Sequence, residues 1–338
     1  MRIIFILTLL LSISSCETIR SGQVIRTDHI IDAENDVRLH IREITPTDSK
    51  HHTPLVMIHG GGPGATASFD LPIKGSSFAQ NLVDKGFKVY LVNIRGWERS
   101  TLPQYDFSDS LTIIGSHLEA SQDIYATVKW ILDKENIGKV HLFGWATGGH
   151  WAGYYSTKYP ETVQTFISLN SLYGVNAPWG LRQYFQSDDD STQFNKTSFF
   201  RESPQKSLTR SWTRTIPIDN KENWRDTRVE KAYSVNASSF GEDTTVMKVP
   251  GGYREESFYM SLGKKYWDAK DIEVPALIMR TELDFWSRPE DLKAIEKDML
   301  HAPRSRFITI PGTHYVFLDK TDKGKRKLIE EMIIFMER

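Results

Sequence analysis

A turn flanked by glycines, Gly144-Trp145-Ala146-Thr147-Gly148, falls between a predicted strand over 139–143 and a predicted helix over 149–158. Such a sharp turn, here called the elbow, strains its central residue and tolerates only glycine at its crowded flanks. Serine at its centre would be an exposed nucleophile, but Ala146 carries a methyl group, which cannot attack a carbonyl. Taken alone, the motif also fits an ordinary glycine-rich turn.

An acid and a histidine follow two later strands. Asp284 comes after a predicted strand over 276–280, and His314 comes after one over 306–310. A histidine in this role takes the proton of a nucleophile, while the acid fixes its tautomer and stabilises the imidazolium. Glu282, two residues before Asp284, is the second candidate for the acid.

A glycine-rich loop, His59-Gly60-Gly61-Gly62-Pro63-Gly64, directly follows a predicted buried strand. Acyl transfer needs backbone N–H donors aimed at the developing oxyanion, and glycines let a substrate approach closely. We expect one donor from Gly61 or Gly62 and a second from Thr147. Pro63 has no N–H and cannot serve.

The chain order of elbow, acid and histidine resembles the α/β-hydrolase superfamily over about 23–338. The resemblance implies an α/β fold with a mostly parallel sheet, helices on both faces and an inserted cap. It also implies acyl transfer on a carboxylic ester or lactone, without a cofactor or a metal. Bacterial esterases of this superfamily that act outside the cytoplasm include macrolide esterases, so a macrolide-type antibiotic is one expected substrate.

The glycine loop is also similar to that of proline iminopeptidases, as is the segment Asn93-Ile94-Arg95-Gly96-Trp97-Glu98-Arg99-Ser100. That family carries Asp and Gly where this chain has Asn93 and Glu98, and the elbow lacks its flanking pattern. The resemblance therefore favours ester hydrolysis over peptidase action.

Short apolar runs alternate with helical patterns, which is typical of α/β proteins. The predicted strands cover 23–28, 37–43, 54–58, 88–93, 139–143, 165–170, 276–280 and 306–310, and the predicted helices cover 77–85, 118–135, 149–158, a segment beginning at 289, and 323–336. The alternation stops over 172–270, here called the cap, which is polar and aromatic without clear strands. The core is expected over 23–171 and 271–338, with substrate contacts from Gly62, Trp145, Trp179, Phe285 and Trp286.

The N-terminus has the pattern of a bacterial export signal. Arg2 precedes the apolar run Ile3–Leu11, and Ile13-Ser14-Ser15-Cys16 resembles a lipobox. We expect a signal region over 1–16, lipidation of Cys16, a tether over 17–22, and a membrane-anchored protein outside the cytoplasm. The alternative is an ordinary cleaved signal with an incidental cysteine.

Composition narrows the function classes. The 338 residues have a formal net charge of −1, 39% hydrophobic residues and one cysteine. Disorder, an internal disulfide framework, a Cys-rich zinc site and non-specific nucleic-acid binding are therefore disfavoured. The pattern Gly60-x-Gly62-x-x-Ala65 only loosely fits a dinucleotide loop, because no acidic residue closes the next strand. The expected partners are a small-molecule ester and, through the lipid, a membrane; no oligomeric state is predicted.

Ala146 has two explanations. Retention of Asp284, His314 and the glycine loop favours a deliberate Ser→Ala change in an otherwise complete site. The presence of the signal region favours a natural pseudoenzyme that uses its cavity to bind a small apolar ligand. Either way, the chain as written is expected to lack acyl-transfer activity.

Overall fold

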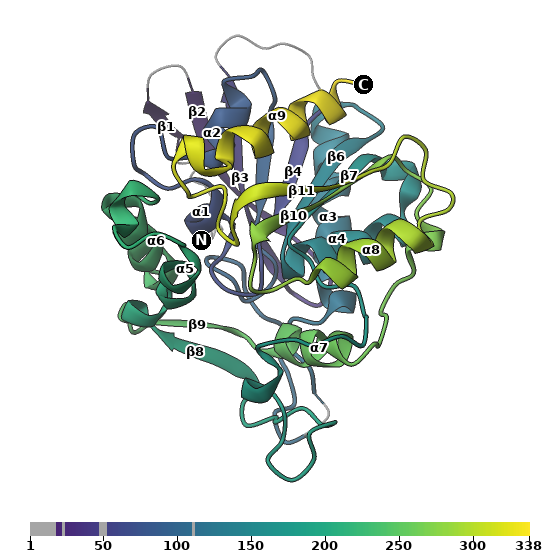
Figure 1. Ribbon diagram of the computed structural model, residues 1–338. Helices are drawn as coiled ribbons and strands as arrows, with labels where there is room; N and C mark the ends of the chain where they lie inside the picture. The colour runs from purple at the N-terminus through teal and green to yellow at the C-terminus, as the bar shows by residue number, and fades with distance from the viewer. Residues whose placement is uncertain (1–17, 22–23, 47–52, 110–111) are drawn as a thin grey trace, which may run out of the picture.

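The computed structural model describes residues 18–21, 24–46, 53–109 and 112–338. The predicted signal region and Cys16 lie outside the described residues. A nine-stranded sheet with the order β1-β2-β3-β5-β4-β6-β7-β10-β11 forms the centre of the molecule (Figure 1). Its strands are β1 (Thr18–Ser21), β2 (Val24–Asp32), β3 (Arg38–Pro46), β4 (Leu55–Ile58), β5 (Val89–Val92), β6 (Val140–Trp145), β7 (Val163–Leu169), β10 (Ala276–Leu283) and β11 (Arg306–Thr313).

The sheet is mostly parallel. Strands β5, β4, β6, β7, β10 and β11 run parallel to one another, and β1, β2 and β3 add an antiparallel edge next to β5. Parallel strands covered on both faces read as continuous apolar runs, and every residue of Leu55–Ile58 is buried. The predicted fold class, an α/β-hydrolase fold, is confirmed.

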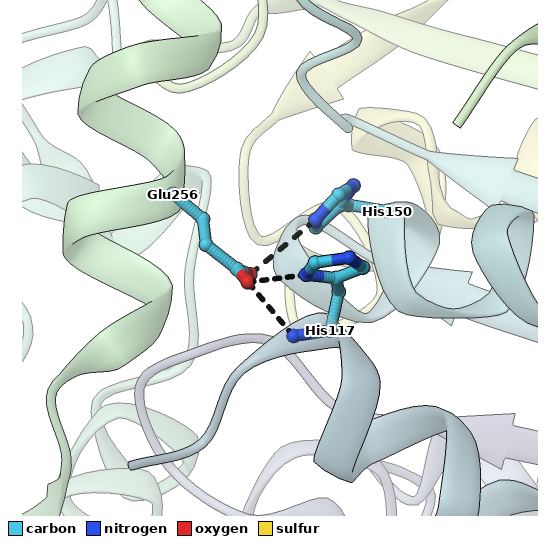
Figure 2. Close-up of side chains that lie close together, drawn as sticks. All are labelled: His117, His150 and Glu256. Atoms are coloured by element: carbon cyan, nitrogen blue, oxygen red, sulfur yellow. Dashed lines mark hydrogen bonds and ion pairs between the residues drawn. The ribbon is translucent and has the colours of Figure 1, made fainter. Parts of the chain in front are cut away.

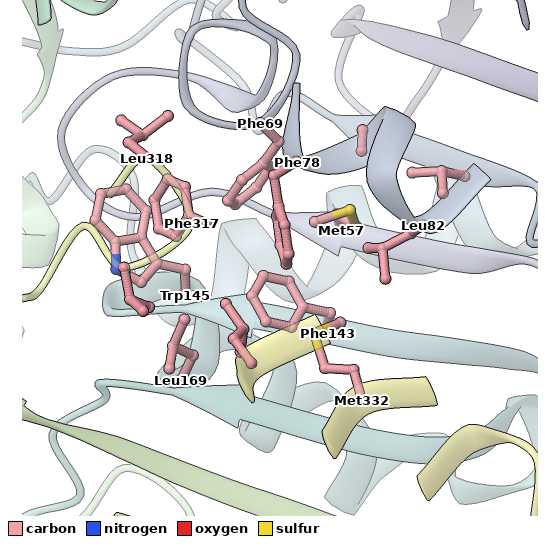
Figure 3. Packing of buried hydrophobic residues seen from close by; sticks show 14 of the residues in the cluster. Met57, Phe69, Phe78, Leu82, Phe143, Trp145, Leu169, Phe317, Leu318 and Met332 are labelled. Atoms are coloured by element: carbon pink, nitrogen blue, oxygen red, sulfur yellow. The ribbon is translucent and has the colours of Figure 1, made fainter. Parts of the chain in front are cut away.

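Helices cover both faces of this sheet (Figure 1), and the sheet separates two hydrophobic cores. The helices are α1 (Ala65–Phe69), α2 (Phe78–Val83), α3 (His117–Glu135), α4 (Thr147–Lys158), α5 (Arg210–Thr215), α6 (Thr227–Ser238), α7 (Gly252–Ser261), α8 (Pro289–Asp298) and α9 (Lys325–Met336). Figure 3 shows the core on the α2 and α9 face, where Phe69 packs on Phe143 and Phe317 at ring distances of 5.8 and 5.3 Å. Trp145 of the elbow is part of this core, so close packing of buried side chains supports the elbow.

The cap contains two strands that the sequence pattern did not predict. Strand β8 (Phe200–Pro204) pairs antiparallel with β9 (Val246–Pro250), and Figure 1 shows the pair beside α5, α6 and α7 below the main sheet. The expectation of a cap without strands was wrong because Phe-Arg-Glu-Ser-Pro is polar and becomes a strand only through its distant partner.

The predicted tether also differs from the structure. Thr18–Ser21, most of the expected 17–22 linker, forms strand β1 and pairs with β2 along its whole length. This stretch therefore extends the sheet. Among the described residues, no helix has both the length and the apolar character needed to cross a membrane.

Candidate active site

The elbow joins β6 to α4, and Ala146 is its central residue. Ala146 has φ 52° and ψ −117°, a backbone conformation that side-chain-bearing residues rarely adopt. A Cβ on Gly144 would lie 2.2 Å from the carbonyl oxygen of Gly148, and one on Gly148 would lie 2.3 Å from that of His59. Both flanking glycines are therefore required by close backbone packing, as the motif predicts.

Asp284 and His314 come together at the ends of β10 and β11. His314 Nδ1 lies 2.6 Å from Asp284 Oδ1, and the Asp284 side chain is fully buried. Asp284 also accepts hydrogen bonds from the backbone N–H groups of Trp286 and Ser287. Glu282, the second candidate acid, is exposed. Because Nδ1 is committed to Asp284, Nε2 is the ring nitrogen available to a group in the cavity.

The backbone of His314 is held by two side chains. Trp145 Nε1 and Asn170 Nδ2 both donate to the His314 carbonyl oxygen, at 3.1 and 3.3 Å. Asn170 also accepts a hydrogen bond from the Thr281 N–H at 2.8 Å, so it links the ends of β7, β10 and β11. The sequence did not predict this role for Asn170, and its position at the end of the predicted strand 165–170 was the only available signal.

The glycine loop presents free donors beside the elbow. In the described part of the chain, the backbone N–H groups of Gly61 and Thr147 donate to no other group. His59 shapes the loop, since its Nδ1 contacts the Gly60 carbonyl oxygen at 2.6 Å. Burial lowers the pKa of His59 to about 4, so this ring is neutral near pH 7. Gly61 and Thr147 both line the cavity described below, and their role as oxyanion donors stays a prediction.

The two departures from the iminopeptidase pattern have a structural use. Asn93 Oδ1 accepts from the N–H of Ala65 at 2.7 Å, and Glu98 Oε1 accepts from that of Ala67 at 3.0 Å. A carboxylate and an amide oxygen therefore satisfy the first donors of α1, which begins directly after the glycine loop.

A cavity of about 410 Å³ lies over the elbow. Predicted site residues in its lining are Gly61, Gly62, Trp145, Ala146, Thr147, Phe285, Trp286 and His314. The sequence pattern did not predict the charged and phenolic part of the lining, which comprises Tyr184, Arg201, Glu202, Arg214, Tyr233, Tyr253, Arg254 and Tyr315. Most of these residues come from the cap, where no motif marks them, and they give the cavity a polar side that the sequence did not predict.

Trp179 lies outside this lining. Its indole packs with Leu172 and Met260, and its Nε1 donates to the Trp286 carbonyl oxygen at 2.8 Å. The predicted substrate contact at Trp179 is therefore replaced by a supporting role behind Trp286.

A second carboxylate–histidine cluster lies where α7 of the cap meets α3 and α4 (Figure 2). Glu256 Oε1 lies 2.6 Å from His117 Nδ1, and Glu256 Oε2 lies 3.4 Å from His150 Nε2. Burial alone raises the pKa of Glu256, but its hydrogen bonds to His117 and His150 outweigh burial and bring the pKa to about 2.

The ligand atoms of this cluster lie within 4.8 Å of one another, as in a metal site. However, Trp267 Nε1 donates to His150 Nδ1 at 3.2 Å, which leaves the proton of a neutral His150 ring on Nε2. A metal at Nε2 would move that proton to Nδ1, against the indole N–H. The geometry therefore fits a hydrogen-bonded joint better than a metal site.

The elbow, the acid and the histidine follow the parallel strands β6, β10 and β11, in the chain order that defines the α/β hydrolase class. A model of the α/β hydrolase fold family matches residues 53–321, more than half of the chain. The chain therefore belongs to the α/β hydrolase fold family.

Two curated relatives match part of the chain. The 2-hydroxy-6-oxononadienedioate/2-hydroxy-6-oxononatrienedioate hydrolase 1 of Pseudomonas putida is 29% identical over 152 residues, 44% of this chain and 46% of that protein. The corresponding hydrolase of Burkholderia vietnamiensis (strain G4 / LMG 22486) is 32% identical over 146 residues, 43% of this chain and 44% of that protein. These matches span less than half the length of either relative.

Solved structures match more of the chain at lower identity. The enol-lactonase from Burkholderia xenovorans LB400 has a TM-score of 0.59 and 14% identity, covering 92% of this chain and all of that one (100%). A thermophilic esterase from Thermogutta terrifontis has a TM-score of 0.56 and 15% identity, covering 91% of this chain and 99% of that one. At these identities the likeness is one of fold.

Proposed function

We propose that this fold carries a serine hydrolase site for carboxylic esters or lactones, in which Ala146 occupies the place of the nucleophile. The observation that carries the proposal is the strained backbone of Ala146, which lines the same cavity as His314. A strained residue costs of order 1–3 kcal/mol and persists where the surrounding structure enforces it. Here the enforced position is the one from which a serine would face His314.

Each remaining group has a role in that chemistry. His314 would accept the proton of a serine at position 146 through Nε2, while Asp284 holds Nδ1 and stabilises the imidazolium. The N–H groups of Gly61 and Thr147 would stabilise the oxyanion of the tetrahedral intermediate. His314 would then return its proton to the leaving alcohol, and the acyl group would pass to water.

Ester and lactone chemistry fits the names of two of the structurally similar proteins, an esterase and an enol-lactonase. A macrolide-type lactone is one member of this class. Peptidase action from a free amino terminus fits less well, because Arg201, Arg214 and Arg254 in the lining would repel a cationic amine.

The test restores the nucleophile. We expect Ala146→Ser to hydrolyse short activated esters and to become covalently labelled by an aryl phosphonate, whereas the parent protein does neither. Labelling is followed by intact-mass spectrometry, with heat-denatured Ala146→Ser as the control for non-specific reaction. A folded Ala146→Ser protein that stays unlabelled and inert on a broad ester panel would refute the proposal.

Ala146 itself favours a second candidate, a binding protein that retains the cavity without turnover. This role requires the parent protein to bind an ester or its acid product at the elbow. It becomes the better account if ligands bind while Ala146→Ser remains inactive.

A further inference from the structure

Arg201, in the cavity lining, lacks the carboxylate partner that Arg95, Arg225 and Arg288 have. Arg201 on β8 is half-buried and lines the cavity. Its Nη1 donates to Tyr253 Oη at 2.6 Å, and its Nε donates to Ser203 Oγ at 3.0 Å. Within the described ranges, no carboxylate lies at ion-pair distance from its guanidinium, and Nη2 has no hydrogen-bond partner.

The contrast with the fully buried arginines is clear. These form short ion pairs, namely Arg95 with Asp123 at 2.6 Å, Arg225 with Glu230 at 2.5 Å and Arg288 with Asp291 at 2.8 Å. Removing a charge from water costs several kcal/mol unless a counter-charge compensates. Among the described residues, no carboxylate neutralises the charge that Arg201 brings to the cavity lining, and an anionic ligand would supply that counter-charge.

The rest of the lining strengthens the positive potential. Arg254 stacks on Phe185, with 4.9 Å between the guanidinium carbon and the ring centre. The one carboxylate of the lining, Glu202, instead pairs with Lys248 at 3.1 Å. A cavity lined by one sign of charge concentrates ligands of the opposite sign.

The position of the guanidinium places this anion site beside the reacting groups. A Cβ on Gly62 would lie 3.7 Å from Arg201 Nη1, so the guanidinium faces the glycine loop. The ring of Tyr253 fills the space where a Cβ on Gly61 would stand, at 2.1 Å, and its hydroxyl holds Arg201. The same tyrosine thus covers the loop and aims the cation at the cavity.

From this geometry we infer that Arg201, held by Tyr253, is a carboxylate-binding subsite, and that the ligand is an ester or lactone that carries a free acid group. The ester or lactone group of this ligand rests on the proposed function, whereas the carboxylate subsite does not. Arginine suits this role because its planar donors match the two oxygens of a carboxylate.

The test uses the Ala146 protein itself, which has no nucleophile at the elbow to turn a bound ester over. The probes are the monomethyl esters of glutarate, adipate and suberate, each compared with its neutral dimethyl ester by tryptophan fluorescence or ligand-observed NMR. We expect at least one half-ester to bind about tenfold more tightly than its diester, as for a charge-assisted hydrogen bond.

Variants assign the preference to one side chain. Arg201→Gln should abolish it and Arg201→Lys should retain part of it. Arg210→Gln, which removes an exposed charge of the cap outside the cavity lining, should leave it intact. Tyr253→Phe keeps the charge and tests the subsite if Arg201→Gln does not fold; it should weaken half-ester binding alone.

Two results would overturn the subsite: equal binding of half-ester and diester by the parent, or equal weakening of both probes by Arg201→Gln. Failure of the proposed function looks different. A half-ester preference with an inert Ala146→Ser protein supports the subsite and refutes the hydrolase, whereas turnover of diesters without a half-ester preference does the reverse.

Discussion

Two carboxylate–histidine pairs in this molecule have the same close contact and different surroundings. Asp284 and His314 are joined at 2.6 Å at the edge of the cavity, and Glu256 and His117 are joined at 2.6 Å between the cap and the core. His314 lines the cavity, whereas neither Glu256 nor His117 does. The pair alone therefore does not define a catalytic site.

The second histidine nitrogen makes the difference. His314 uses Nδ1 for Asp284 and keeps Nε2 for the cavity, where a nucleophile would stand. His150, the second histidine at Glu256, has Nδ1 occupied by Trp267 and Nε2 directed to the carboxylate. With both nitrogens occupied, His150 can join two helices but has no lone pair for a proton transfer.

The largest expected effect separates the two clusters by activity. In an Ala146→Ser background, His314→Ala should lower kcat/KM by roughly 10³-fold or more, because triad members act as a unit. His150→Gln should reduce stability and leave kcat/KM within a few fold. Steady-state ester hydrolysis and urea unfolding measure the two effects. Comparable loss of activity in both folded variants would show that the two clusters do not differ in their role in hydrolysis.

A smaller effect concerns acid stability. The pKa of Glu256 is lowered from 4.5 to about 2, so its contribution to folding is complete above pH 4.5 and is lost as the pH falls toward 2. Glu256→Gln should cost about 3 kcal/mol at neutral pH, as expected for breaking a buried ion pair. Its unfolding free energy should also fall less steeply than that of the parent below pH 4.5.

The control for this prediction is Glu255→Gln, a half-buried position next along the same helix. Urea unfolding at a series of pH values gives both slopes. Protonation of the other acidic groups lowers the unfolding free energy of all three proteins alike. The readout is therefore the difference between their slopes of unfolding free energy against pH. Parallel curves for Glu256→Gln and the parent would mean that Glu256 does not ionise with the expected pKa.

The smallest effect tests the tautomer of His150. Trp267→Phe removes the N–H donor at Nδ1, which allows the ring proton to move there and frees Nε2 to bind a metal. We expect Zn²⁺ to raise the thermal midpoint of Trp267→Phe relative to EDTA, and to leave the parent unchanged. A zinc-dependent shift in the parent that disappears in His117→Ala would instead establish a metal site.

The contact between Asp284 and His314 could be predicted because parallel strands bring their carboxyl ends to one edge of the sheet. Asp284 and His314 each follow a strand whose apolar run is visible in the sequence, and the glycines of the elbow are fixed by backbone contacts of 2.2 and 2.3 Å. Glu256 could not be found this way, because 139 residues separate it from His117 and no motif links them.

The sequence by itself determined the sheet apart from β1, the elbow and the acid–histidine pair, because local periodicity and backbone sterics indicate them. It also determined that Ala146 cannot act as a nucleophile. Only the tertiary structure decided that Arg201 and Tyr253 face the glycine loop and that Trp179 does not line the cavity. The physical reason is that the cap has little regular periodicity, so its side chains take their places through long-range packing against the core.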